Sequence, residues 1–172
     1  MIVSVLISLL ILGCYIGMII AKNGIPYSIS ETYYRINHKF LFPAVMLLSA
    51  FSLLPGALES STENSQFLMF LGTVAMCIIG LAPDFVNGEK AERITHYVAS
   101  AALFLCTQIW VGVNFPGHLF CWVAYVAYIL LNIKNSDKSI NLYDRFISLK
   151  PAFWAEMVII FDTYLTVIIG LV

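Results

Sequence analysis

The sequence predicts an all-α protein, a polytopic transmembrane bundle of six helices joined by short loops, and three observations predict it. Hydrophobic residues make up 60% of the 172 residues and charged residues 11%, whereas soluble domains average about 45–50% and about 25%. The apolar residues fall in six stretches, and about 20 such residues in a helix span a bilayer. Every Lys and Arg falls in or beside alternate gaps between these stretches, as the positive-inside rule predicts.

The gaps that hold or border the basic residues are assigned to the cytoplasmic side. They cover 22–38, 84–93 and 134–151, whereas the gaps around 59–63 and 114–118 contain no cation. Both termini are therefore expected on the outer side. The net charge of −1 and the dispersed cations argue against a nucleic-acid partner. The nine cations are Lys22, Arg35, Lys39, Lys90, Arg93, Lys134, Lys138, Arg145 and Lys150.

The first two spans are expected at 2–21 and 39–54. No basic residue precedes the first, and its apolar run is too long for a signal peptide, so we interpret it as a retained helix. Lys22 on its carboxyl side places that end in the cytoplasm. The second span is expected to end at Pro55 and Gly56, because proline disrupts a helix interior.

The remaining spans follow from the apolar stretches at 67–83, 94–113, 119–133 and 152–172. A proline and an aspartate end the third span. Since residues 114–118 form a short connection, the fourth and fifth spans are expected to be antiparallel neighbours. The sixth span closes a single transmembrane domain that covers the whole chain.

Two gaps predict helices that lie in the membrane interface. Ser28 and Glu31 have the spacing of a capping box, which predicts a helix near 28–38. Around 139–149, apolar residues alternate with charged ones, a pattern typical of an amphipathic interfacial helix.

Four ionisable residues are predicted at the cytoplasmic end of the spans. His38, Asp84 and His96 are the candidate metal ligands, because imidazole and carboxylate groups bind divalent ions such as zinc. Asp84, His96 and Glu156 are equally candidate catalytic residues, as general acid and base. The alternative is a structural role at the interface, with Arg93 pairing with Asp84 across its loop.

Asp162 is the most costly side chain to place in the bilayer, since it lies about 15 Å along the last span. No Lys or Arg occurs at that depth. We expect a protonated Asp162 that donates a hydrogen bond to Gln108 or a serine. The alternative is a path for protons or cations through a buried polar layer of Asp162, Gln108, Ser49, Ser52 and Thr73.

The other reactive and aromatic residues are assigned no site. The four cysteines lie in apolar stretches without metal-type spacing, so we expect buried hydrophobic roles. His118 is expected in an outer loop. Trp110, Trp122 and Trp154 lie near span ends, where indole rings anchor helices to the interface.

The motif Gly80-Leu-Ala-Pro-Asp-Phe, with His96-Tyr-Val-Ala-Ser-Ala-Ala-Leu-Phe after the loop, resembles a bacterial six-helix membrane family of unknown function. In that family a Pro and an Asp end the third helix, and a His with small residues opens the fourth. The chain is more distantly similar to the DRAM and Sfk-type membrane proteins. The resemblance implies a six-helix architecture in a bacterial inner membrane, and no particular reaction.

A competing resemblance is to the alkaline ceramidase and adiponectin-receptor superfamily of membrane hydrolases. It implies a zinc site to which Ser28 or Ser30, His38, Asp84 and His96 correspond. The chain departs from that superfamily, since it has six predicted spans instead of seven and lacks a His-xxx-His pair in its last span.

Three classes of function remain open. The favoured one is a small membrane component that binds lipid or a partner protein, including a second copy of the chain. The first alternative is a metal-dependent lipid hydrolase, an amidase or esterase, with an ion at the cytoplasmic His and Asp residues. The second is a small proton- or ion-coupled channel or transporter, which requires a polar path from Asp162 to one face.

Overall fold

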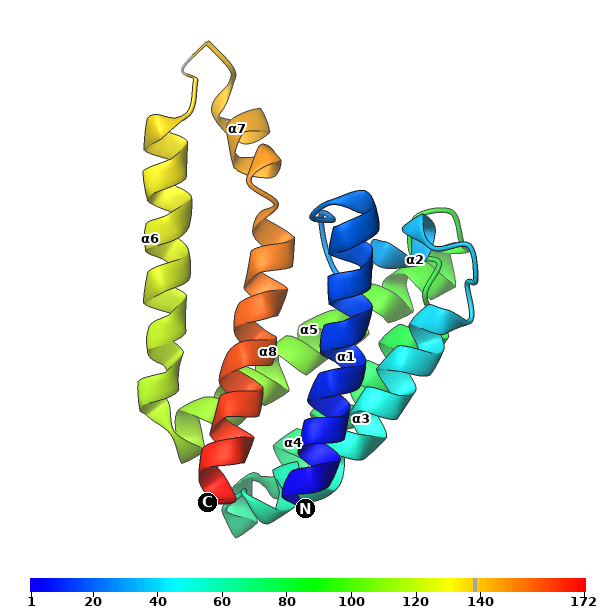
Figure 1. Ribbon diagram of the computed structural model, residues 1–172, viewed down its shortest axis with the longest axis vertical. Coiled ribbons are helices and arrows are strands. Elements are labelled where there is room, and N and C mark those ends of the chain that lie inside the picture. The colour runs from blue at the N-terminus through cyan, green and yellow to red at the C-terminus, as the bar shows by residue number, and fades with distance from the viewer. Residues whose placement is uncertain (138) are drawn as a thin grey trace.

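A computed structural model describes residues 1–137 and 139–172, and Lys138, one of the predicted cytoplasmic cations, lies outside them. The described residues form helices and connecting segments without a strand, which confirms the all-α class. Six of the helices in this part are long and apolar enough to cross a membrane, as in an integral membrane protein (Figure 1).

The spanning segments are formed by six long helices, two of which are extended by a 3₁₀ turn at their amino ends. Two short helices lie between them. The long helices are α1 (Ile2–Asn23), α3 (Leu41–Glu59), α4 (Gln66–Leu81), α5 (Lys90–Asn114), α6 (Phe120–Asn135) and α8 (Pro151–Gly170). The 3₁₀ turns are η1 (Glu63–Ser65) and η2 (Pro116–Leu119), and the short helices are α2 (Thr32–Arg35) and α7 (Leu142–Ser148).

Helix α3 ends at Glu59, beyond the end that Pro55 and Gly56 predict. Prolines are tolerated inside spanning helices because neighbouring groups satisfy the freed backbone. Gly56 is a packing residue, since a Cβ built on it would lie 2.3 Å from the Cγ2 atom of Val5 on α1. The glycine therefore lets α1 and α3 approach closely, as small residues do in membrane bundles.

Both chain termini lie at one end of the bundle, as Figure 1 shows. We call this the terminal end. The helix ends, short helices and connecting segments that carry the described Lys and Arg residues lie at the opposite end, which we call the basic end. The structure thus gathers on one side the cations that alternate along the sequence.

Helices α1, α3, α4 and α5 pack side by side in that order, and α8 packs against α1, α3 and α5. Helix α6 packs mainly against α8, and most of its side chains are exposed. In Figure 1 the hairpin of α6 and α8 stands beside the other four helices. Helix α8 therefore lies between α6 and the other four long helices, and its polar residues face both.

A helix is confirmed within the predicted range 139–149 as α7 (Leu142–Ser148), and its place in the membrane interface stays a prediction. Its first turn is capped by Asn141, whose side-chain oxygen accepts a hydrogen bond from the backbone N–H of Asp144 at 2.9 Å. The predicted helix near 28–38 is only one turn long, α2. The rest of that segment is fixed by hydrogen bonds to α1 and α8, which form part of the site described next.

Candidate functional site

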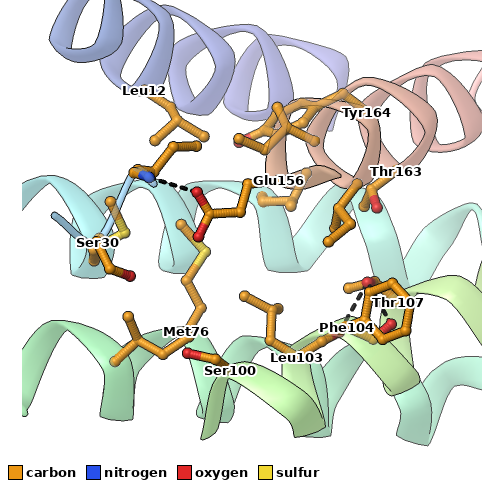
Figure 2. Close-up of a pocket in the computed structure, with 16 residues that line it drawn as sticks. Leu12, Ser30, Met76, Ser100, Leu103, Phe104, Thr107, Glu156, Thr163 and Tyr164 are labelled. Atoms are coloured by element: carbon orange, nitrogen blue, oxygen red, sulfur yellow. Dashed lines mark hydrogen bonds between the residues drawn. The ribbon is translucent and has the colours of Figure 1, made fainter. Parts of the chain in front are cut away.

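A cavity of about 160 Å³ lies between α1, α3, α4, α5 and α8. Its walls are mostly apolar, with Leu12 from α1, Met76 from α4 and Leu103 from α5 among them (Figure 2). An engineered protein cavity of about 150 Å³ holds a benzene molecule. The cavity is therefore large enough for a small ring or a short piece of alkyl chain.

Glu156 places a carboxylate on the wall of this cavity (Figure 2). It lies about 8 Å along α8 from Pro151, at about 1.5 Å per residue, and so within the spanning segment. Its Oε2 atom accepts a hydrogen bond from the backbone N–H of Ile29 at 2.5 Å. The other carboxylate oxygen points into the cavity (Figure 2).

The segment that precedes α2 closes the cavity at the basic end. Ile29 and Ser30 contribute to the wall, and the backbone N–H of Phe153 on α8 donates to the carbonyl oxygen of Tyr27 at 2.8 Å. Together with the bond from Ile29 to Glu156, this contact attaches the segment to α8 at two points. The wall is thus joined to the helix that carries the carboxylate.

The same segment is attached to α1 through Thr32, which is 1% exposed. Its hydroxyl donates to the carbonyl oxygen of Ile29 at 2.5 Å and lies 2.6 Å from the Tyr15 hydroxyl. Because a threonine hydroxyl has one proton, Tyr15 is the donor in the second bond. Ile29 is therefore held on both sides, and its N–H is directed at Glu156.

The three predicted metal ligands lie at the basic end but do not converge. His38 is exposed and lies beside Phe40. His96 is buried, and its Nδ1 atom lies 2.7 Å from the carbonyl oxygen of Ala82, to which it donates because a carbonyl only accepts. Among residues 1–137 and 139–172, no three His, Cys, Asp or Glu side chains are placed to hold a metal ion. The geometry of the described chain thus offers no support for a metal-dependent hydrolase.

Asp84 serves as a cap for the loop between α4 and α5. Its Oδ1 atom accepts hydrogen bonds from the Tyr34 hydroxyl at 2.9 Å and from the backbone N–H of Asn87 at 3.0 Å. The Tyr34 hydroxyl in turn accepts from the N–H of Val86 at 2.8 Å. These bonds favour a structural role for Asp84, but its partner is Tyr34, and the suggested ion pair with Arg93 does not occur among the described residues.

The Tyr34 contact predicts a dependence of stability on alkaline pH. Burial raises the pKa of Tyr34 from 10.0 to about 12. The stabilisation from this phenol is therefore fully present below pH 10 and is lost as the pH rises through about 12. We expect Tyr34→Phe to lower the melting temperature in detergent at neutral pH, and the difference from wild type to shrink above pH 10. Parallel melting curves of the two proteins check this, and a constant difference across the range would contradict it.

In the middle of the bundle, Asp162 is fully buried and its Oδ1 atom accepts a hydrogen bond from Gln108 at 3.1 Å. Gln108 is oriented by Trp122, whose indole N–H donates to the amide oxygen at 2.7 Å. Since an indole nitrogen is only a donor, the amide nitrogen must face Asp162. The structure therefore joins the expected pair, with the direction of donation opposite to the expected one.

The other members of the predicted polar layer lie apart from this chain of bonds. Thr73 donates to the carbonyl oxygen of Met69 in its own helix at 2.8 Å, and Ser52 is half-buried on α3. The backbone oxygen of Ser49 accepts from the Ser8 hydroxyl at 2.6 Å. Ser8 also contacts the Tyr164 hydroxyl at 2.5 Å, so this second buried group joins α1, α3 and α8.

Three contacts have no signature in the sequence. The donor to Glu156 is a backbone N–H, which every residue except proline carries. Trp122, interpreted as an interfacial anchor, orients Gln108. His118, expected in an outer loop, lies in η2 with its Nδ1 atom 2.6 Å from the Thr166 hydroxyl on α8.

Comparisons with known proteins add no further constraint on this site. No family model, curated protein or solved structure matches the chain. The role of the cavity and of the two intramembrane carboxyl groups is therefore argued from geometry and physical chemistry.

Proposed function

We propose that this chain is an integral membrane protein that binds a small amphiphilic molecule from the bilayer in the cavity between α1, α3, α4, α5 and α8. The observation that carries this proposal is the carboxylate of Glu156 on the wall of a mostly apolar cavity. Ligand sites are typically apolar hollows with a few polar groups that orient the ligand. A charged group inside a membrane is costly and marks a functional site by default.

The proposed orientation places the basic end in the cytoplasm and both termini outside. The described cations at the basic end support it, because cytoplasmic loops are enriched in Lys and Arg. The resemblance of the motif at Gly80 and His96 to a bacterial family favours a bacterial inner membrane. In this orientation Glu156 lies near the cytoplasmic boundary of the bilayer.

Access from the bilayer is supported by Phe104. This residue is 38% exposed and lines the cavity. It also lines a second, shallower hollow on the outer surface of α5 and α6, together with Gln108 and Trp122. Phe104 thus borders both the cavity and a hollow on the outer surface of the bundle, which favours a ligand that arrives from the membrane.

The proposal predicts that a bulky residue in the cavity displaces a bilayer-soluble probe. The probe is dodecanol that carries a photoreactive diazirine near its hydroxyl group, added to the full chain in phosphatidylcholine vesicles. We expect illumination to label cavity-lining residues of α8, and Leu103→Trp to reduce this labelling several-fold. Mass spectrometry of the labelled peptides measures it.

Leu105→Trp is the matched control for this experiment. Leu105 lies two residues further along the same helix and is 53% exposed, so its replacement leaves the cavity unchanged. Labelling of α8 should match the wild type in this variant. Equal labelling of α8 in the two tryptophan variants, or labelling confined to lipid-facing residues, would overturn the proposal.

A further inference from the structure

We propose that the Glu156 end of the cavity selects a primary amine with a short apolar body. This inference rests on the proposed function, and it names the chemical class of the ligand.

The Glu156 carboxylate has unused hydrogen-bonding capacity. A carboxylate has about four acceptor positions on its two oxygens. The N–H of Ile29 takes one of them on Oε2 at 2.5 Å, and the other oxygen faces the cavity (Figure 2). A ligand that carries N–H or O–H donors would complete this partly satisfied group.

The cavity wall offers the Glu156 carboxylate no matching positive charge. No Lys, Arg or His contributes to the cavity wall. The one ion pair among residues 1–137 and 139–172 joins Arg35 to Glu31 outside the cavity. Since an unpaired carboxylate in the membrane costs several kcal/mol, a cationic ligand gains more from this site than a neutral one.

Two serine hydroxyl groups also line the cavity. Ser30 lies on the same side as the Glu156 carboxylate, and Ser100 lies on α5, across the cavity from it (Figure 2). The Ser100 hydroxyl donates its proton to the carbonyl oxygen of His96 at 2.9 Å, so towards a ligand its oxygen acts as an acceptor. An ammonium group has three donors and no acceptor, and this set of acceptors complements it.

The remaining cavity walls limit the size and the polarity of the rest of the ligand. Leu103, Phe104 and Ile160 are apolar, and the cavity volume is about 160 Å³, which suits a body of about benzene size. Because no cation lines the cavity, the phosphate of a zwitterionic lipid headgroup would find no partner there. A simple amine with an alkyl or aromatic body fits these limits better than an aminophospholipid.

The test compares three probes of equal tail length, hexylamine, hexanol and hexanoate, on the full chain in a neutral detergent. Binding is measured from the rise in melting temperature with probe concentration. We expect hexylamine to bind about tenfold more tightly than hexanol, since a hydrogen bond between two charged groups is stronger than one that a neutral hydroxyl makes. Hexanoate should bind most weakly.

Glu156→Gln removes the charge while its amide oxygen can still accept from Ile29. We expect this variant to lose the preference for hexylamine and to retain the binding of hexanol. Glu89→Gln is the matched control, since Glu89 is exposed before α5 at the basic end, and it should leave the preference unchanged. If Glu156→Gln fails to fold, Ser100→Ala provides a second variant, which should weaken hexylamine more than hexanol.

The outcomes separate this inference from the proposed function. Equal binding of hexylamine and hexanol by the wild type, abolished by Leu103→Trp, would overturn the amine selectivity and leave the cavity as a binding site. A preference for hexylamine that Glu156→Gln and Ser100→Ala both leave intact would also overturn it. Binding of no probe, or binding that Leu103→Trp leaves unchanged, would overturn both.

Discussion

Replacing Trp110 with alanine is expected to lower the free energy of unfolding by about 3–5 kcal/mol, the range for large aromatic truncations in packed cores. The Trp110 side chain is 0% exposed, as is its neighbour Val111. Its indole N–H donates to the Ser61 hydroxyl at 2.7 Å, which joins α5 to the segment after α3. The truncation would leave a cavity and remove the bond from the indole, while the Ser61 hydroxyl keeps its bond to the carbonyl oxygen of Ala57. Titration with a denaturing detergent, followed by circular dichroism, measures the change.

Two variants show whether packing or the hydrogen bond dominates at Trp110. Trp110→Phe keeps most of the ring and loses the N–H, so we expect a smaller loss of about 1–2 kcal/mol. Phe120→Ala truncates an aromatic side chain that is 72% exposed, and its effect should stay within about 0.5 kcal/mol. A Trp110→Ala variant as stable as Phe120→Ala would show that the indole is not part of the packed core.

Trp110 also shows why the sequence predicts the depth of a side chain in the membrane better than the direction in which that side chain points. Its position near a span end is typical of an interfacial anchor, yet the structure buries it inside the bundle. The number of spans could be predicted because crossing the bilayer depends on the composition of each segment alone. Which face of a helix contacts another helix depends on tertiary packing. The observed end of α3 differs from the predicted one for the same reason, since Gly56 is a packing residue between α1 and α3.

The candidate site was predictable only in part, for related physical reasons. Asp162 and Gln108 are at similar depth along their spans, and the structure joins them. His38, Asp84 and His96 lie at the same basic end of the bundle, but they do not converge, and each has its own local partner. A common depth is thus necessary for a site and does not suffice for one.

Glu156 illustrates the part of the candidate site that no sequence pattern predicts. It was grouped with the inner histidines because of its depth, whereas the structure places it on the cavity wall beside Ile29 and Ser30. The cavity exists because five helices and one loop segment leave a space between them. No local pattern in the sequence encodes a volume of this kind.

Replacing Gln108 with leucine is expected to lower the free energy of unfolding by about 1–3 kcal/mol, the cost of leaving a buried polar group without its partner. Asp162 is 0% exposed, and its Oδ2 atom has no hydrogen-bond partner among the described residues. Without Gln108 its Oδ1 atom would lose its side-chain donor as well. Unfolding by denaturing detergent measures the change, and Gln66→Leu, at an exposed glutamine, is the matched control.

A double-mutant cycle separates the loss of stability that the unpaired Asp162 carboxyl group causes from the loss that the missing packing of Gln108 causes. If the unpaired carboxyl causes the instability, adding Asp162→Leu to Gln108→Leu should restore part of the stability, because two apolar groups then replace two polar ones. Asp162→Asn should be milder, since its amide oxygen can still accept from Gln108. Equal losses for Gln108→Leu and Gln66→Leu would show that the carboxyl of Asp162 finds another partner or water. The bonds from Trp122 through Gln108 would then contribute no stability to the bundle.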